Sequence, residues 1–281
     1  MKKLICIVLA LCMAAALAAC GGSSSSGNNS TTAANNNTAS ANNAPAAGTE
    51  ASASGSSLTT IEAGKLTIST SPDFPPFEYT DDSGNVIGIE PELMKLICDK
   101  LGLELQIDAM DFNSALLAAE NGKSDAVVSG VTVREDRKAL FDFTTSYTTI
   151  TQAIVSKEGS GITMENLGSY RIGVQSGTTG QEFVEEDFGQ DTVFAYDTYS
   201  LVFQALNNGQ VDCIVMDDAV AKAYIASNPG LTMTNTTYSP EEYAFGFHKG
   251  NEALVNAVNS ALAELMADGT VDSIISKYMT E

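Results

Sequence analysis

The sequence predicts an α/β protein built from two similar lobes, and three observations lead to this prediction. From residue 61 onward, segments with the alternating pattern of strands are followed by segments with helical periodicity, an order typical of α/β proteins. The same order starts again at Arg171. Residues 112–125 also match residues 199–212 at a constant offset of 87. Because any two strand–helix units look somewhat alike, chance similarity is the alternative explanation of this match.

The predicted elements follow from local signals along each half. Glu90-Pro91-Glu92 indicates a helix start, because acids and an early proline suit the first turn, and Gly102 indicates its end. In the first half we expect strands at 65–69, 103–108 and 126–129, and helices at 90–101 and 112–121. In the second half we expect strands at 171–174, 193–196, 213–216 and 243–247, and helices after Gly180 and at 200–208, 219–226, 252–267 and 271–278.

Two of the predicted strands end at matching places in the repeat. Ser129-Gly130 ends the buried strand of the first copy, and Met216-Asp217 ends that of the second. Ligands of open parallel sheets bind beyond the carboxyl ends of the strands. We therefore expect these two ends to face a shared ligand cleft between the lobes.

Residues 1–19 are predicted to be an export signal. Lys2 and Lys3 precede an apolar run at 4–17, which is shorter than the ~20 residues of an ordinary membrane-spanning helix. The run ends in Leu17-Ala18-Ala19-Cys20, followed by two glycines. This stretch resembles a bacterial lipobox, which implies that the thiol of Cys20 is acylated and that the protein is a lipoprotein. An ordinary secretory signal with a chance cysteine is the alternative.

Residues 20–58 are predicted to be a lipidated Cys20 followed by a disordered tether. Ser, Asn, Ala, Thr and Gly make up most of residues 21–58, and Glu50 is their only charged residue. Such a composition buries too little apolar surface to offset the entropy of ordering. A random coil of this length spans roughly 35 Å, which is enough to lift a domain clear of an envelope surface.

Charge and cysteine content exclude several classes of function. The net charge of −21 falls to −23 when Lys2 and Lys3 leave with the signal, and so acidic a surface argues against nucleic acid as a partner. Cys98 and Cys213 are expected to be buried free thiols, since both lie in apolar runs. No metal-type spacing occurs, and His248 is the only histidine. We expect no metal ion, no cofactor and no catalytic residue.

Two charged residues are candidates for holding a zwitterion. Arg137 lies in a predicted loop after the buried strand that ends at Ser129, and an arginine fork suits a carboxylate. Asp217 ends a buried strand, where a charge is costly without a partner. The alternatives stay open at this point, because Arg137 could be a solvated member of the charge run 134–138. Asp217 and Asp218 could simply cap the following helix.

Two loops add further candidates. Ser176-Gly177-Thr178-Thr179-Gly180 lies between a strand and a helix, where backbone N–H groups can face an anion, although a plain glycine turn is the alternative. Phe74 belongs to a loop that two prolines stiffen, and Phe112 opens a helix. Both rings could form the wall of a ligand site or pack in the core.

Five stretches together resemble the periplasmic solute-binding protein family (family 3 type) that serves ABC-type amino-acid importers. The resemblance covers nearly all of residues 61–279. The stretches are Ser69-Thr70-Ser71-Pro72-Asp73-Phe74-Pro75-Pro76-Phe77-Glu78, Val86-Ile87-Gly88-Ile89-Glu90-Pro91-Glu92-Leu93, Ser129-Gly130-Val131-Thr132 with Arg137, Gly173-Val174-Gln175-Ser176-Gly177-Thr178-Thr179-Gly180, and Asp212-Cys213-Ile214-Val215-Met216-Asp217.

The resemblance implies a fold and a set of site residues. It implies the type II periplasmic-binding-protein fold, in which two crossover strands join lobe 1 (60–147 plus 245–281) to lobe 2 (152–240). Arg137 would hold the ligand carboxylate and Asp217 the ammonium, so that a zwitterion bridges the closed lobes. The full set implied for ligand binding is Ser71, Phe74, Phe112, Ser129, Gly130, Thr132, Arg137, Gln175, Thr178, Thr179 and Asp217.

One departure from the family bears on the ligand. Many relatives that bind cationic or polar amino acids carry an acid where Ser71 stands, and the nearest acid here, Asp73, is expected to point elsewhere. Gln175 stands where residues that contact the ligand side chain vary. A neutral polar or modestly apolar amino acid therefore fits best.

The resemblance also implies partners and a location. We expect a monomer that works with an ABC permease and its ATPase, anchored to the membrane through lipid on Cys20. It would lie on the outer surface of a Gram-positive-type envelope, or otherwise in the periplasm. There are two alternatives. One is a same-fold enzyme such as a cyclohexadienyl-type dehydratase, which would need a general acid or base, although no histidine lies near these motifs. The other is a signalling or adhesive surface lipoprotein.

Overall fold

The structure is a computed structural model that describes residues 58–279. Residues 55–281 form one compact unit. The predicted signal at 1–19, the predicted lipidation site Cys20 and all of the predicted tether except Leu58 lie outside the described residues.

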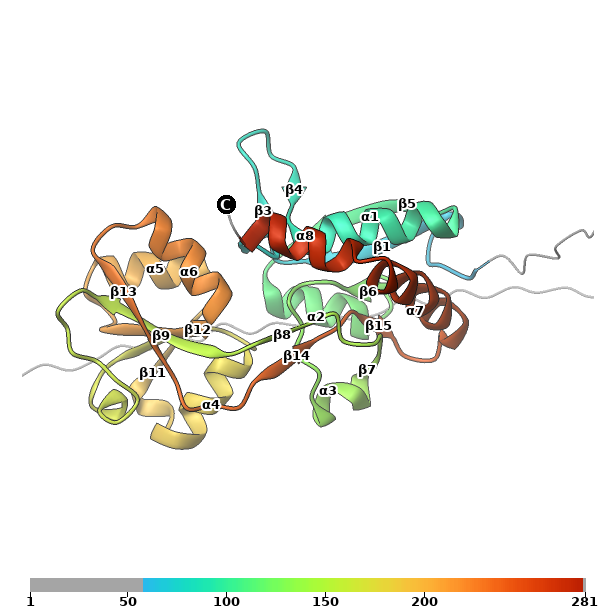
Figure 1. The fold of residues 1–281 in the computed structure, drawn as a ribbon. Coiled ribbons are helices and arrows are strands. Elements are labelled where there is room, and N and C mark those ends of the chain that lie inside the picture. The colour runs from blue at the N-terminus through green and yellow to red at the C-terminus, as the bar shows by residue number, and fades with distance from the viewer. Residues whose placement is uncertain (1–57, 280–281) are drawn as a thin grey trace, which may run out of the picture. The chain divides into compact units, whose positions relative to one another are not determined.

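The first lobe is built around a five-stranded sheet (Figure 1). Its strands are, in spatial order, β5 (Glu104–Ala109), β1 (Lys65–Thr70), β6 (Ala126–Val127), β15 (Gly246–His248) and β7 (Phe141–Phe143). Strand β1 is parallel to β5 and β6, whereas β15 is antiparallel to β6 and β7. The helices of this lobe are α1 (Ile89–Leu101), α2 (Phe112–Glu120), α3 (Glu135–Leu140), α7 (Glu252–Ala267) and α8 (Thr270–Met279).

The second lobe has a sheet of corresponding topology. Its strands are, in spatial order, β11 (Val193–Tyr196), β10 (Ile172–Gln175), β12 (Cys213–Asp217), β9 (Gln152–Lys157) and β13 (Leu231–Asn235). Its helices are α4 (Thr179–Phe188), α5 (Tyr199–Asn207) and α6 (Asp218–Ser227), with 3-10 turns at Leu167–Ser169 and Gln190–Thr192. Strand β10 is parallel to β11 and β12, and β9 is antiparallel to β12. The repeat in the sequence thus corresponds to α2–β6 in one lobe and α5–β12 in the other.

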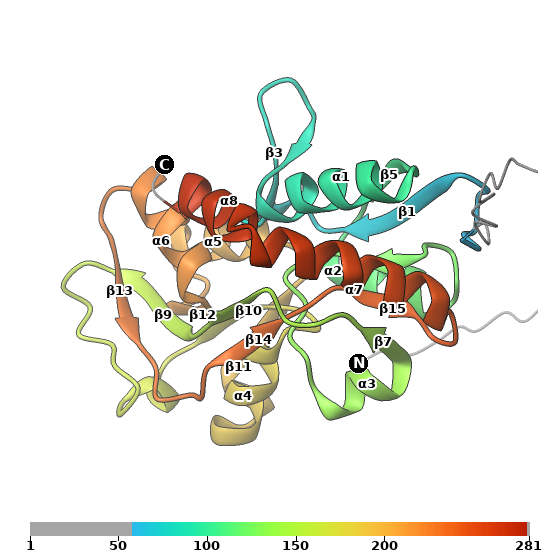
Figure 2. The same cartoon turned by 45° about the vertical axis from the view of Figure 1, so that its right-hand side comes forward.

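The chain crosses between the two sheets twice, on neighbouring strands. Strands β8 (Thr148–Ile150) and β14 (Glu241–Tyr243) pair antiparallel, and both lie between the two lobes (Figure 2). A single bridge between Thr132 and Tyr243 links the second crossover to the loop after β6. This loop carries several predicted ligand-binding residues, so the crossover strands lie directly beside the site.

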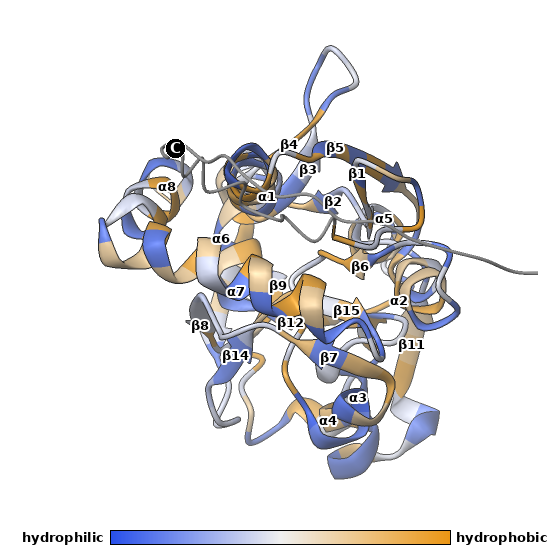
Figure 3. Cartoon of the chain, turned by 90° about the vertical axis from the view of Figure 1, so that its right-hand side faces the viewer, coloured by the Kyte–Doolittle hydropathy of each residue, from blue (hydrophilic) through white to orange (hydrophobic). Residues whose placement is uncertain are grey.

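The core residues follow the periodicity of the sequence. On α7 the buried residues are Leu254, Val255, Val258, Ala261, Leu262 and Leu265, which recur at the helical spacing of one buried face. Figure 3 shows hydrophobic and hydrophilic residues alternating along this helix. Cys98 and Cys213 are buried free cysteines, as the sequence predicted. Within residues 58–279, no helix combines the length and apolar character that crossing a bilayer requires.

The structure departs from the sequence-based elements in several places, and it adds α3, β7, β9 and β13, which were not expected. The buried strand expected at 126–129 is shorter, because β6 ends at Val127 and Ser129 and Gly130 already belong to the following loop. The strand expected at 243–247 is divided into the end of β14 and the separate strand β15. The loop after β1 forms a small sheet of β2 (Asp73–Phe74), β3 (Glu78–Thr80) and β4 (Val86–Ile87).

Candidate ligand-binding cleft

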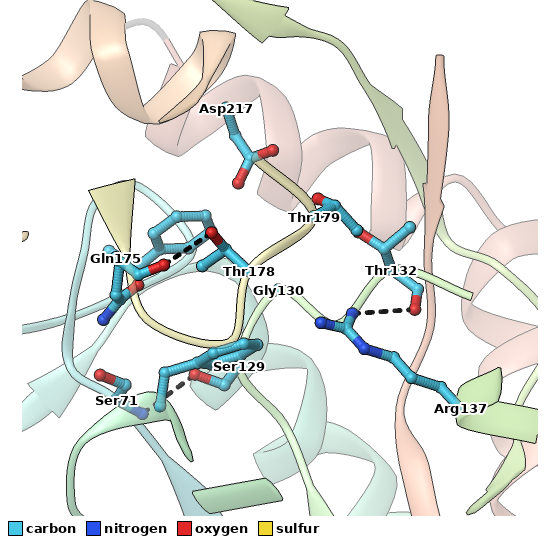
Figure 4. Close-up of a pocket in the computed structure, with 11 residues that line it drawn as sticks. Ser71, Ser129, Gly130, Thr132, Arg137, Gln175, Thr178, Thr179 and Asp217 are labelled. Atoms are coloured by element: carbon cyan, nitrogen blue, oxygen red, sulfur yellow. Dashed lines mark hydrogen bonds between the residues drawn. The ribbon is translucent and has the colours of Figure 1, made fainter. Parts of the chain in front are cut away.

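All eleven predicted ligand-binding residues line one pocket between the lobes (Figure 4). The first lobe contributes Ser71, Phe74, Phe112, Ser129, Gly130, Thr132 and Arg137, and the second contributes Gln175, Thr178, Thr179 and Asp217. The pocket contains about 310 Å³ of empty space, part of it open to solvent. Among the described residues, no cluster of His, Cys, Asp and Glu could hold a metal ion.

Arg137 is buried and lies in the short helix α3 rather than in a loop. Its side chain is 5% exposed, and its guanidinium carbon lies 5.7 Å from the centre of the Phe112 ring. Nη1 donates to the carbonyl of Thr132 at 3.1 Å, and Nη2 donates to the carbonyl of Gly177 in the second lobe at 3.0 Å. Burial lowers the pKa of Arg137 to about 10, so it stays charged at neutral pH. Three of its five N–H donors remain for a ligand.

Asp217 is the last residue of β12 and occupies the N-cap position of α6. Its side chain makes no capping hydrogen bond, so the interpretation that it merely caps the helix fails. Asp217 Oδ1 accepts a hydrogen bond from Gln152 Nε2 at 2.5 Å. Burial and the negative charge of Glu241 raise the pKa of Asp217 to about 8. A buried acid without a cation or a capping role is available to a cationic ligand group.

The N-terminus of α4 lies in the pocket wall on the second-lobe side. Thr178 is its N-cap, and the Thr178 hydroxyl accepts from the Gln181 N–H and donates to the Gln175 carbonyl at 2.8 Å. This hydroxyl is therefore engaged within its own lobe. Thr179 opens the helix, and a helix start leaves backbone N–H groups for an anion. Together with Arg137, these groups make this side of the pocket suited to a carboxylate.

Ser129 and Gly130 bind two buried acids instead of presenting all their donors to the pocket. The Ser129 hydroxyl donates to Glu78 Oε1 at 3.0 Å, and the Gly130 N–H donates to Glu90 Oε2 at 3.1 Å. Glu90 Oε1 also accepts from the hydroxyl of Tyr147 at 2.6 Å. Burial raises the pKa of both glutamates, and the charge of Glu90 adds to the effect at Glu78. The two acids therefore fix the loop after β6.

The two pocket phenylalanines are both wall and core. Phe74 is 6% exposed and stacks on Tyr199 of the second lobe, with ring centres 5.6 Å apart. Phe112 is 5% exposed and packs in a first-lobe cluster while its ring faces Arg137. Both rings thus pack in the protein interior and also line the pocket.

Gln152 and Glu241 are buried beside the pocket, and sequence reasoning missed both. Gln152 Nε2 reaches Asp217 and also Glu241 Oε1, at 2.8 Å. Gln152 is at the start of β9 and Glu241 is on β14, so both stand where a crossover joins the second lobe. The only sequence signal was a polar residue at the start of an apolar strand.

Comparison with known proteins decides the family. The sequence model of the bacterial extracellular solute-binding proteins, family 3, matches residues 66–281. The chain belongs to this family. A probable histidine-binding protein of Neisseria gonorrhoeae is 30% identical over 100% of this chain and 97% of the relative. The arginine-binding extracellular protein ArtP of Bacillus subtilis is 31% identical over 100% of this chain and 99% of its own length.

Solved structures of family 3 proteins share the two-lobed type II fold. An ancestral arginine-binding protein bound to glutamine superposes with a TM-score of 0.74 and 38% identity, covering 78% of this chain and all of that one. These relatives are solute-binding proteins rather than enzymes. Family 3 proteins are extracytoplasmic, and the curated relatives are amino-acid-binding proteins of ABC transporters.

Proposed function

We propose that this protein is the extracytoplasmic substrate-binding component of an ABC importer and that it binds a free amino acid between its lobes. The observation that carries the proposal is the pairing of Arg137 and Asp217. One buried cation and one buried acid line the same pocket from different lobes, and neither has an ion-pair partner within 4 Å among the described residues. A zwitterion supplies both missing charges.

The two ends of the ligand occupy different environments in this proposal. The carboxylate binds the remaining N–H groups of Arg137 and the start of α4, where a fork of donors and a helix N-terminus both favour an anion. The ammonium binds Asp217. Phe74 and Phe112 enclose the ligand between these points.

The side chain of the ligand is uncharged in this proposal. Arg137 and Asp217 are the only charged residues of the pocket lining, and the zwitterion uses both. Asp73 accepts from the Ser71 hydroxyl and from the Tyr199 N–H, so this acid faces α5 and not the ligand. Gln175 Nε2 donates to the Asp197 carbonyl at 3.2 Å, which leaves its amide oxygen for a polar ligand. A neutral polar amino acid therefore fits this pocket better than arginine or histidine, the ligands given in the names of relatives.

Binding closes the lobes in this proposal, with boundaries at 60–147 plus 245–281 and at 152–240. Contacts across the cleft support closure, among them the Arg137–Gly177 hydrogen bond and an ion pair between Arg134, the N-cap of α3, and Glu182 of α4. The ligand favours the closed form only by its differential affinity for it. The permease and its ATPase would recognise the closed monomer. Lipid on Cys20 and the tether would hold this monomer at the membrane.

A thermal-shift screen tests the proposal. Residues 55–281 are unfolded and refolded to remove bound ligand, and the melting temperature is measured with each of the twenty amino acids. A ligand at 1,000 times its Kd stabilises by about 4 kcal/mol. We expect one or a few neutral amino acids to raise Tm, and Arg137→Ala and Asp217→Ala to abolish the shift. No response to any amino acid would refute the proposal.

A further inference from the structure

A buried cluster of acceptors surrounds Asp217 at the crossover strands. The single Nε2 group of Gln152 donates to Asp217 Oδ1 at 2.5 Å, to Glu241 Oε1 at 2.8 Å and to Thr179 Oγ1 at 3.4 Å. All four side chains are more than nine-tenths buried. An amide nitrogen has only two hydrogens, so it cannot satisfy three acceptors at once.

The cluster also contains polar atoms without any partner. Gln152 Oε1 and Glu241 Oε2 are buried acceptors that make no hydrogen bond among the described residues. The Tyr243 hydroxyl interacts with Asp217 and lowers its pKa, against the larger opposite effect of burial. The cluster therefore holds more acceptors than donors. A primary ammonium bound to Asp217 would bring N–H donors and a positive charge to the edge of this cluster.

The charges around Asp217 are unbalanced. Glu241 and Asp218 both raise its pKa through their negative charge, and Tyr199 and Tyr243 also interact with it electrostatically. Arg134 and Arg137 interact with Glu241 over a longer range, but neither forms an ion pair with it. Two neighbouring buried carboxyls without a close cation do not both ionise readily.

We propose that Glu241 is a second acid of the ammonium subsite, and that the ammonium of the ligand displaces a proton that Asp217 holds because Glu241 stands beside it. Glu241 does not contact the ligand. It acts on Asp217 through its charge and through the shared amide of Gln152, and is therefore a positioning residue. The reaction balances as protonated protein plus zwitterion giving complex plus one H⁺. This inference rests on the proposed function. It adds that binding releases one proton per ligand and that the ligand must carry a primary ammonium.

The sign of the pH dependence follows from the free protein. Because the pKa of Asp217 is raised to about 8, most of the free protein carries this proton at pH 7 and below. Binding must release it, so affinity should rise as pH rises toward 8 and then level off. One linked proton changes affinity by about tenfold per pH unit.

Titration calorimetry tests the inference on residues 55–281 with the amino acid that the screen identifies. At pH 7, heats measured in phosphate, Hepes and Tris give the number of protons released. We expect close to one per ligand for the wild type. Glu241→Gln should lower it to about half or less, because burial still raises the pKa of Asp217. Glu242→Gln is the matched control, since Glu242 is the next residue on β14 and is exposed; it should release the wild-type number.

The possible outcomes separate the two proposals. If no amino acid binds, the proposed function fails. If an amino acid binds with no proton release and with the same Kd from pH 6 to 8, only the proton displacement is refuted. The wild-type pH series decides this point even if Glu241→Gln does not fold. Tight binding of the N,N-dimethyl derivative of the ligand would contradict the need for a primary ammonium.

Discussion

The carboxylate of Asp73 in the first lobe accepts a hydrogen bond from the backbone N–H of Tyr199 in the second, at 2.7 Å. Tyr199 is the first residue of α5, so an acid from one lobe caps a helix of the other. The Asp73 carbonyl also accepts from the hydroxyl of Tyr224 at 2.8 Å. This contact lies across the mouth of the cleft and can form only when the lobes are close together.

Loss of this contact should speed ligand release. We expect Asp73→Ala to raise the dissociation rate about fivefold, since one lost hydrogen bond costs about 1 kcal/mol. Asp73→Asn should release the ligand at nearly the wild-type rate, because its amide oxygen still accepts and burial raises the pKa of the natural acid. Stopped-flow dissociation measures both.

Thr198→Ala is the matched control for the Asp73 variants. The Thr198 hydroxyl caps the same end of α5 from within the second lobe, by accepting from the Leu201 N–H at 3.3 Å. Its loss should lower Tm while the dissociation rate stays unchanged. Equal dissociation rates for Asp73→Ala and the wild type would mean that the contact does not contribute to closure.

Arg137→Lys should weaken ligand binding at least about tenfold despite keeping the charge. Lysine has no planar fork, so it cannot bind a carboxylate in two places while also reaching the Thr132 and Gly177 carbonyls. Arg171→Lys serves as the control, because Arg171 is an exposed partner of Asp212 on the second lobe. Calorimetric affinities should be unchanged for Arg171→Lys, and equal loss in both variants would argue against a specific role of Arg137.

Gly130→Ala should impair both stability and binding. Gly130 has φ of +55°, and a Cβ there would lie 2.5 Å from Cε1 of Phe74, so the pocket wall must move. Gly159→Ala imposes a similar backbone penalty at φ +76°, with no atom within 4 Å of the new Cβ. We expect both variants to lower Tm and only Gly130→Ala to weaken binding. Normal affinity in Gly130→Ala would show that Phe74 does not shape the site.

The thiols of Cys98 and Cys213 should not react in the folded protein. Burial raises the pKa of both to about 12, and only the thiolate is nucleophilic. Incubation of residues 55–281 with a thiol reagent at pH 8 should modify neither, whereas both should react in guanidinium chloride. Rapid modification of either native thiol would contradict the burial found for it.

Local sequence patterns predicted the pocket better than its surroundings. Ser129, Gly130 and Asp217 could be placed at a cleft because they follow buried strands of the two lobes, and ligands bind beyond the carboxyl ends of such strands. Long-range pairing could not be predicted in the same way, since Gln152 and Glu241 are 89 residues apart and meet only because two crossover strands lie together. For the same reason, nothing local indicated that the donors of Ser129 and Gly130 would be taken by Glu78 and Glu90.

Arg137 and Asp73 show how neighbouring charges obscure a prediction. The run at 134–138 resembles a solvated loop, but it folds into α3 and buries one arginine at the cleft. Asp73 was expected to point away from the ligand, and its side chain does so by binding the backbone N–H of Tyr199. Its partner is in the other lobe, which no local pattern indicates.

The most direct test of the central claim compares an amino acid with derivatives that lack one of its charges. Calorimetry would measure the affinity of residues 55–281 for the amino acid found in the screen, for its amide and for its N-acetyl form. If Arg137 and Asp217 hold a zwitterion, neither derivative binds at concentrations that saturate the protein with the amino acid. Binding of either derivative as tightly as the amino acid would contradict the account.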